Sequence, residues 1–318
     1  MKLALAGDTM LGRGVAAALE SSPGRALLAS EVLDATAEAD LFVLNLECCV
    51  SERGRRFPDP RKPFFFRAPP AAAETLAGWG VSCVTLANNH ALDFGEEALL
   101  DTFAHLASAG IAWVGAGPDV ERARAPATLE GGGLSLAVVG LTDHPAEYAA
   151  REDRAGVAFA DLWDGPAPGW LLESVRGLRA DAVLVTPHWG PNMAAAPVSH
   201  VRAAGRALVA AGATLVAGHS AHVFQGVEGP ILYDLGDFLD DYATDTVLRN
   251  DLGLLYLVEL DARGPARLEA VPLELEYCST RLAAGEAAAW IRRRFREACG
   301  AFGTEVAEES GRLVVTWR

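Results

Sequence analysis

Residues 3–13 read LALAGDTMLGR, an apolar run that ends at the acidic residue Asp8. A short, continuous apolar run is typical of a strand buried on both faces, because a strand with one wet face alternates apolar and polar residues. Gly7 and Asp8 interrupt the run far short of the apolar core of a signal peptide. We therefore expect this stretch to be the first strand of a sheet, with Asp8 at its carboxyl end.

The same pattern recurs through the first two thirds of the chain. The runs are LFVLNL (41–46), VSCVTLA (81–87), LSLAVVGLT (134–142), AVLVT (182–186) and TLVAG (214–218), and each is followed by polar residues. Helix-like segments such as residues 95–110 and 199–213 lie between them. Because strands and helices alternate, the sequence predicts an α/β fold built on a buried sheet.

Beyond residue 250 the pattern changes to strand-like segments joined by short turns, which favours antiparallel pairing. Residues 284–298 predict one late helix, with Ile291, Phe295 and Ala298 on its apolar face. No linker of low complexity divides the chain. We predict a single domain over residues 1–318, in which residues 1–240 carry the motifs and residues 250–318 complete the fold.

The composition is that of a folded, acidic protein, with 51% hydrophobic residues and a formal net charge of −15. Such a surface repels nucleic acid and anionic lipid, so we expect neither as a partner and instead expect a small-molecule or peptide substrate. No apolar run approaches the roughly 20 residues that span a bilayer. The five cysteines form no CxxC pair, and the predicted location is the reducing cytoplasm.

Six side chains with potential ligand atoms follow the apolar runs. They are Asp8, Glu47, Asn89, His188, His219 and His222. Loops that leave the carboxyl ends of neighbouring strands converge, so these side chains are expected in one place. This mixture of carboxylate, amide and imidazole suits Mn, Fe or Zn better than Ca or Mg. Each residue taken singly can also be an ordinary polar group at a strand end, but six coincidences favour a metal site.

Six short motifs occur in order over about residues 1–240. They are GDTMLGR (7–13), NLE (45–47), TLANNHALDFG (85–95), PHWG (187–190), GHSAHVFQG (218–226) and YDLGDF (233–238). On these motifs the chain resembles the CapA or PGA_cap family, a relative of the calcineurin-like metallophosphoesterases. The resemblance implies a four-layer αββα sandwich with two mixed β-sheets, and a site for one or two divalent ions (Mn, Fe or Zn).

The resemblance also implies a role for each matched residue. Asp8 and His222 correspond to ligands of a first metal ion, and Glu47 stands where a bridging carboxylate is usual. The ligands implied for a second ion are Asn89, His188 and His219. His90 corresponds to the histidine that donates a proton to a leaving group.

Two departures from the metallophosphoesterase pattern affect the first metal position. Met10 stands where a histidine usually follows the first aspartate, and a thioether binds hard or borderline ions weakly. The usual GDxxD motif is absent, and Glu47 takes its place. A single ion, or two ions of unequal affinity, is therefore an alternative to a bridged pair.

Two further residues near the motifs have two possible roles each. Asp93 either orients His90 or caps the helix that starts at Gly95, and capping is the preferred role. Arg13 either binds an anionic substrate group through its guanidinium or is an ordinary arginine at the surface of the first helix.

Several other polar residues lie outside the six ligand positions. Asp143 and Asp237 lie at further strand ends and are candidates for supporting or acid/base groups. No motif surrounds the remaining histidines, which are interpreted as structural: His105, His144 and His200.

Three functions follow from this pattern. The preferred one is hydrolysis of a phosphoester or related bond by metal-activated water, with His90 as the acid. Close behind it is metal-dependent acid/base epimerisation at a Cα atom of a ribosomal precursor peptide, a role known for CapA-like proteins in lasso-peptide biosynthesis. The third is an accessory role in capsule or poly-γ-glutamate synthesis, which is the role that the family is named for.

Overall fold

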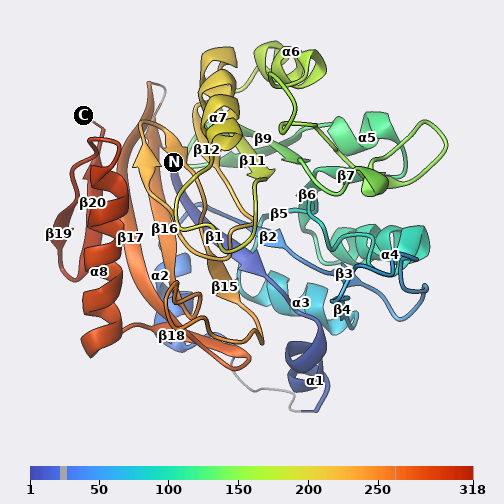
Figure 1. The fold of residues 1–318 in the computed structure, drawn as a ribbon, viewed down its shortest axis with the longest axis horizontal. Helices are drawn as coiled ribbons and strands as arrows, with labels where there is room; N and C mark the ends of the chain where they lie inside the picture. Colours follow the sequence, from blue (N-terminus) through green and yellow to red (C-terminus); the bar gives the residue numbers. More distant parts are fainter. Residues whose placement is uncertain (22–26, 262, 318) are drawn as a thin grey trace.

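The computed structural model describes residues 1–21, 27–261 and 263–317. Two large β-sheets lie face to face, and helices cover their outer faces (Figure 1). Both sheets contain parallel and antiparallel strand pairs. The expected αββα sandwich with two mixed sheets is therefore confirmed.

The first sheet is parallel around its centre and antiparallel toward the C-terminal strands. β1 (Lys2–Thr9) pairs in parallel with β2 (Leu41–Leu46), and the sheet continues through β5 (Cys83–Thr85) to β6 (Ala112–Val114). On its other side β1 pairs with β16 (Leu252–Asp261), followed by β17 (Gly264–Glu276), β20 (Arg312–Thr316) and β19 (Ala307–Glu309). β15 (Asp237–Leu239) also pairs with β1, and β18 (Ser279–Leu282) pairs with β17.

The second sheet has the strand order β13 (Val227–Glu228), β14 (Ile231–Leu232), β12 (Leu215–Ala217), β11 (Ala182–His188), β9 (Leu134–Thr142) and β8 (Ala127–Gly131). Two short pairs lie outside the large sheets: β3 (Cys49–Val50) with β4 (Arg67–Ala68), and β7 (Ala116–Gly117) with β10 (Gly156–Val157). The strands predicted from apolar runs are therefore present in both sheets.

The helices divide between the outer faces of the two sheets. The first sheet is covered by α1 (Arg13–Ser21), α2 (Ser30–Thr36), α3 (Ala71–Gly78) and α4 (Gly95–Ser108). The second is covered by α6 (Gly169–Gly177) and α7 (Ser199–Ala211), with α5 (Val120–Arg124) near its edge. The short 3-10 helix η1 (Ala146–Tyr148) follows β9, and its Tyr148 packs into the core on the helix side of the first sheet. The expected late helix is α8 (Gly285–Gly300), which buries Ile291, Phe295 and Cys299 between the sheets.

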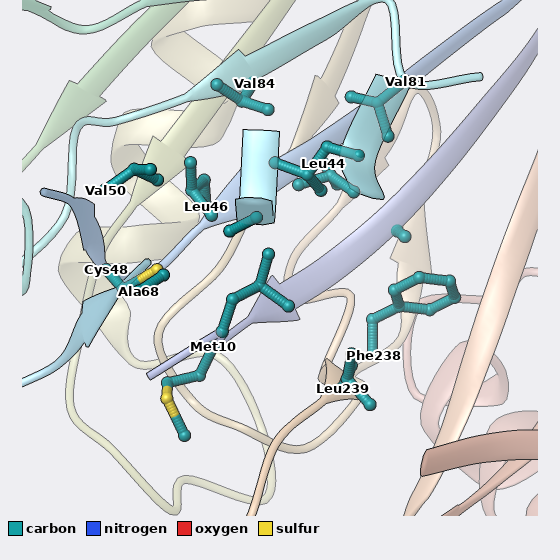
Figure 2. Close-up of a cluster of buried hydrophobic side chains, with 14 of the residues drawn as sticks. Met10, Leu44, Leu46, Cys48, Val50, Ala68, Val81, Val84, Phe238 and Leu239 are labelled. Atoms are coloured by element: carbon teal, nitrogen blue, oxygen red, sulfur yellow. The ribbon is translucent and has the colours of Figure 1, made fainter. Parts of the chain in front are cut away.

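Alternate residues of the central strands belong to different apolar cores. On β1, Ala4 and Ala6 pack toward the helices α1–α4, whereas Leu3 and Leu5 pack between the sheets. Figure 2 shows part of the core on the helix side, where Met10 lies among Leu46, Cys48 and Leu239. Burial on both faces explains why these strands are apolar along their whole length, and it leaves their carboxyl ends as the places for polar side chains.

Gly7 allows two strands to approach closely at the end of β1. A Cβ atom at this position would lie 1.8 Å from the carbonyl oxygen of Gly236, so a side chain cannot be accommodated. The approach places Asp237 of β15 beside Asp8 in the parallel register. No helix within the described ranges is both long and apolar enough to cross a membrane.

Candidate metal centre

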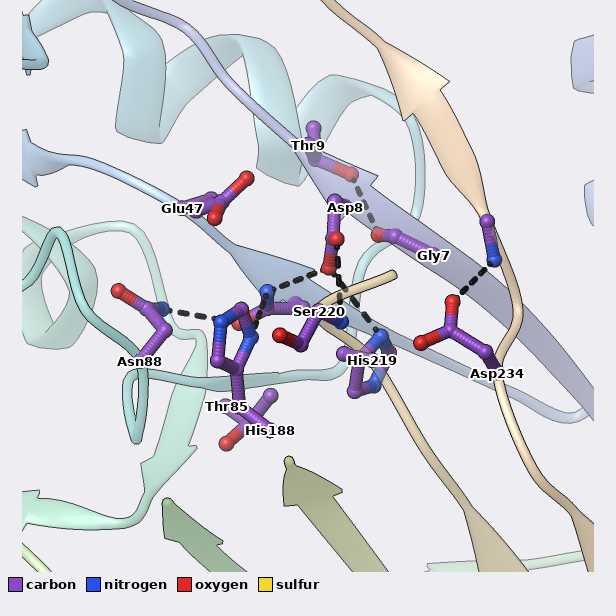
Figure 3. Close-up of polar contacts among 12 residues, drawn as sticks. Gly7, Asp8, Thr9, Glu47, Thr85, Asn88, His188, His219, Ser220 and Asp234 are labelled. Atoms are coloured by element: carbon purple, nitrogen blue, oxygen red, sulfur yellow. Dashed lines mark hydrogen bonds and ion pairs between the residues drawn. The ribbon is translucent and has the colours of Figure 1, made fainter. Parts of the chain in front are cut away.

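The six predicted ligand residues leave strands of both sheets. Asp8 is on β1, Glu47 follows β2 and Asn89 follows β5, whereas His188 ends β11 and His219 and His222 follow β12. A parallel bridge joins His188 to His219. Figure 3 shows Glu47, Asp8, His188 and His219 grouped where these strand ends meet. The two sheets therefore contribute side chains to one region.

Asp8, Glu47 and His222 form what we call the carboxylate subsite. One ligand atom from each lies within 4.8 Å of the others, and all three side chains are buried. Oε2 of Glu47 accepts a hydrogen bond of 3.3 Å from the Tyr242 hydroxyl, but Oε1 has no partner among the described residues. A buried, unpartnered carboxylate oxygen is costly unless a cation or proton meets it.

Asn89, His188 and His219 form what we call the imidazole subsite. Within the described part of the chain, Asn89 Oδ1, His188 Nε2 and His219 Nδ1 are buried atoms without hydrogen-bond partners. His219 Nε2 lies 2.9 Å from the Thr186 hydroxyl, which leaves Nδ1 as its free ligand atom. That Nδ1 is 3.5 Å from Asp8 Oδ1, and His222 Nδ1 is 3.2 Å from Asp8 Oδ2. Asp8 therefore connects the two subsites.

Asn45, which sequence reasoning missed, links residues of both subsites. Its Nδ2 donates to Asp8 Oδ1 at 2.7 Å and lies 3.4 Å from His188 Nδ1. Its Oδ1 accepts from Asn88 Nδ2 at 2.9 Å. A polar residue inside the otherwise apolar run LFVLNL was the available signal, because a buried strand interior rarely holds an amide without partners.

The carboxylate subsite holds protons in the metal-free protein. Burial, helped by the charge of Asp8, raises the pKa of Glu47 to about 8. Burial alone would lower the pKa of His222, but Asp237 and Glu47 outweigh it and hold that pKa well above the usual value. Burial alone would raise the pKa of Asp8, but the neighbouring imidazoles of His219 and His222 keep it well below its usual value.

His188, in the imidazole subsite, is deprotonated at neutral pH. Burial lowers the pKa of His188 well below its usual value, although the negative charge of Asp8 opposes the change. A neutral imidazole is the form that binds a metal ion, so His188 needs to lose no proton before it acts as a ligand.

His90 is paired with Asp93 at the edge of the site. His90 Nδ1 lies 2.6 Å from Asp93 Oδ2, and the ring stacks on Phe66 with centroids 3.9 Å apart. Asp93 also accepts from the backbone N–H of Phe66 at 2.6 Å and from Lys62 Nζ at 2.9 Å. The preferred expectation that Asp93 caps a helix is wrong, because α4 has Phe94 at its N-cap and no side-chain cap.

Arg13 is engaged by an acidic neighbour. Its Nε lies 3.1 Å from Asp241 Oδ2, and one terminal nitrogen lies 2.7 Å from Asp241 Oδ1. The rings of Phe64, Phe66 and Tyr242 lie 5.4–5.8 Å from the guanidinium carbon. Because the two carboxylate oxygens of Asp241 already contact Nε and a terminal nitrogen of the guanidinium, this geometry favours a structural role for Arg13 over binding of a substrate anion.

Asp237 and Met10 explain how the first metal position differs from the usual pattern. Asp237 Oδ1 lies 2.8 Å from His222 Nδ1, the same nitrogen that lies 3.2 Å from Asp8 Oδ2, so Asp237 and Asp8 together fix the orientation of this imidazole. Met10 is fully buried, and its sulfur accepts a hydrogen bond of 3.0 Å from the backbone N–H of Gly12. Position 10 therefore belongs to the apolar core and offers no hard ligand.

A cleft of about 400 Å³ opens beside the imidazole subsite. Asn89 and His90 line it together with the aromatic side chains of Phe57, Phe64 and Tyr148. Arg61, Lys62 and His144 also line it, together with the acidic residues Asp59 and Glu147, so the lining carries charges of both signs. The cleft gives a substrate access to Asn89 and His90.

The residues present fit a divalent metal ion. Buried atoms from Glu47, Asn89, His188 and His219 lack hydrogen-bond partners among the described residues, although buried polar atoms are normally paired. Oxygen and nitrogen donors of this kind suit borderline ions such as Mn, Fe or Zn. The arrangement can hold positive charge beside a histidine that is positioned for proton transfer.

Comparisons with known proteins identify the family and the fold. Residues 2–242 match the family described as bacterial capsule synthesis protein PGA_cap. A probable polyglutamine synthesis accessory protein of Mycobacterium tuberculosis is 35% identical over 303 residues, which cover 89% of this chain and 78% of that protein. The PGA biosynthesis protein CapA of Bacillus subtilis is 28% identical over 275 residues, covering 85% and 70% of the two chains.

Two solved structures share the fold. A phosphatase from Mycoplasma pneumoniae matches with a TM-score of 0.53 and 13% identity, over 86% of this chain and 93% of that one. A hypothetical protein from Thermus thermophilus matches with a TM-score of 0.51 and 17% identity, over 86% and 99%. At these identities the likeness concerns the fold alone. The chain belongs to the PGA_cap family of bacterial capsule synthesis proteins and has a metallophosphoesterase-like fold.

Proposed function

We propose that this protein is a metal-dependent hydrolase of phosphoesters or related bonds. The observation that carries the proposal is the set of buried, unpartnered ligand atoms of Glu47, Asn89, His188 and His219 beside a cleft that His90 lines. The two subsites would hold one or two divalent ions, which polarise a phosphoryl oxygen and activate water when bound.

His90 would exchange the proton with the leaving group. Asp93 engages Nδ1, so Nε2 is the ring nitrogen left to meet a substrate. Burial lowers the pKa of His90 to about 4 in the metal-free protein, although Asp93 opposes the shift. An anionic substrate in the cleft favours the imidazolium form and would raise this pKa toward the value that a proton donor needs.

The test is hydrolysis of p-nitrophenyl phosphate and bis-p-nitrophenyl phosphate after reconstitution with Mn²⁺ or Zn²⁺. We expect His90→Gln to lower kcat by about 10²–10⁴-fold, the range for removal of a general acid. His105→Gln, on the outer helix α4, is the matched control and should keep the parent rate. Equal rates for His90→Gln and the parent, or no turnover with either ion, would contradict the proposal.

A second candidate is an accessory role in the synthesis of a capsular polymer. The names of the two relatives described above favour it. The two candidates are separated by deleting the gene in its host and complementing with the parent or with His90→Gln. If only the parent restores the polymer, the accessory role depends on catalysis; if both restore it, the protein acts without the proposed chemistry. Neither relative is described as an epimerase, and epimerisation is not proposed.

A further inference from the structure

The cleft contains a second histidine that the proposed hydrolysis does not use. His144 follows β9 of the second sheet and lines the cleft together with Asn89 and His90. Its side chain is 27% exposed, and its ring centroid lies 5.3 Å from that of His188. His144 is therefore open to the cleft and lies next to the imidazole subsite.

A buried aspartate fixes the ring of His144. Nδ1 of His144 lies 2.5 Å from Asp143 Oδ1, and the Asp143 side chain is fully buried. The other oxygen, Oδ2, accepts from the backbone N–H of Gly190 at 2.9 Å and lies 3.4 Å from His200 Nε2. Because these contacts come from separate segments, Asp143 cannot turn away from His144 without losing partners.

The arrangement repeats that of His90 and Asp93. In each pair, Nδ1 of the histidine lies within hydrogen-bond distance of a carboxylate oxygen of a fully buried aspartate. A backbone N–H also donates a hydrogen bond to each of these aspartates. In both a further basic side chain also lies near the carboxylate, Lys62 in one pair and His200 in the other. His90 follows β5 of the first sheet and His144 follows β9 of the second, so each sheet contributes one histidine–aspartate pair to the same cleft.

A purely structural role explains His144 less well. A histidine that served only to pack the core would be buried, whereas the His144 ring is partly exposed and lines the cleft. Engagement of Nδ1 by Asp143 leaves Nε2 as the nitrogen available to a molecule in the cleft.

We propose that His144 is a second substrate-contacting residue, whose protonated ring donates Nε2–H to an oxygen of the substrate phosphoryl group, and that Asp143, which accepts at Nδ1, is its positioning residue. The inference rests on the proposed phosphoester hydrolysis and assigns a further contact within it. Histidines on two sides would hold the phosphoryl group in place beside Asn89.

The test uses inorganic phosphate as the probe and Zn²⁺-loaded, ¹⁵N-histidine-labelled protein. Long-range proton–nitrogen NMR spectra are recorded during a phosphate titration, and the His144 signals are assigned by their loss in His144→Gln. We expect the Nε2 signal of His144 to shift with the same saturation curve as that of His90. His200 is the matched control, because it lies near the same Asp143 but does not line the cleft, and its signals should shift less.

Asp143→Asn tests the positioning role. This variant should weaken phosphate binding about 10-fold and raise KM for p-nitrophenyl phosphate more than it lowers kcat, the loss expected for one hydrogen bond to a charged group. An unchanged melting temperature and intact Zn²⁺ content would separate this effect from misfolding.

The outcomes distinguish the inference from the function on which it rests. If phosphate binds and shifts His90 but leaves Nε2 of His144 unmoved, the inference is overturned and the hydrolase proposal stands. If the Zn²⁺-loaded protein binds no phosphate, both are overturned.

Discussion

Asp8 connects the carboxylate subsite to the imidazole subsite, but Glu47 and His222 in the first hold protons that His188 in the second lacks. The raised pKa values of Glu47 and His222 keep these two side chains protonated at neutral pH. At His188 the lowered pKa leaves a neutral ligand that is ready to bind. At Glu47, burial and the charge of Asp8 favour the protonated form, and at His222 the carboxylates of Asp237 and Glu47 do so. At His188, burial outweighs the charge of Asp8 and removes the proton.

This difference predicts an order of metal binding. An ion that enters the imidazole subsite displaces no proton from His188, whereas an ion that enters the carboxylate subsite must displace protons from Glu47 and His222. The buried thioether of Met10 adds no ligand to the carboxylate subsite. We therefore infer two affinities, with the imidazole subsite filling first at pH 7.

The largest expected effect comes from removing an imidazole ligand. His188→Ala should lower the affinity for the first Zn²⁺ or Mn²⁺ equivalent by more than ~100-fold, beyond the 10–100-fold typical of residues that only support a ligand. Isothermal titration calorimetry measures the change. His105→Ala should bind like the parent, and parent-like binding by His188→Ala would refute the assignment of this subsite.

A change in the other subsite should act on the second ion only. Glu47→Gln keeps the size of the side chain but removes its charge, so the affinity for the second equivalent should fall about 10–100-fold at pH 8 while the first changes little. Calorimetry in buffers with different ionisation enthalpies should also show fewer protons released than in the parent. An equal loss at both equivalents would show that the subsites are not distinct.

A support residue should have a smaller effect. Asp237→Asn weakens the contact that orients His222 and should lower the affinity for the second equivalent about 10-fold. Asp181→Asn, at an exposed contact with Ser135, is the control. Metal binding by Asp237→Asn that matches this control would mean that His222 does not depend on Asp237.

The smallest effect concerns the stability of the metal-free protein. The pKa of Glu47 is about 8 in the folded state against 4.5 for a free glutamate, so this group stabilises the fold fully below about pH 4.5 and loses that contribution as the pH rises toward 8. Urea unfolding should show stability falling between pH 5 and 8, by at most about 1.4 kcal/mol per pH unit, the limit for one proton. In Glu47→Gln the fall in the free energy of unfolding with pH should be smaller. A fall as steep as in the parent would mean that a group other than Glu47 holds the proton.

Much of the architecture could be predicted from the sequence, because its signals are local. Strands such as β1 and β9 are buried on both faces, so their apolar runs are continuous and easily recognised. The polar residues that end these runs, Asp8 and His188 among them, could be expected at one edge because parallel strands share it.

The contacts among the site residues could not be predicted in the same way. Asn45 lies inside an apolar run, and its importance appears only when β1 and β11 place Asp8 and His188 on either side of it. Asp93 was expected to cap α4, but the loop that carries Phe66 and Lys62 surrounds its carboxylate instead. His144 has no motif around it. Its partner Asp143 is the preceding residue, but the groups that hold Asp143 in place, the Gly190 backbone and His200, come from segments distant in the sequence.

Metal content tests the central claim most directly. Protein purified without an affinity tag, in buffers free of chelator, is analysed by elemental mass spectrometry beside His219→Ala. The account predicts between one and two equivalents of Mn, Fe or Zn per chain in the parent and a clear loss in the variant, because His219 Nδ1 is a buried atom that lacks a partner among the described residues. Absence of metal from the parent, even after reconstitution with each ion, would contradict it.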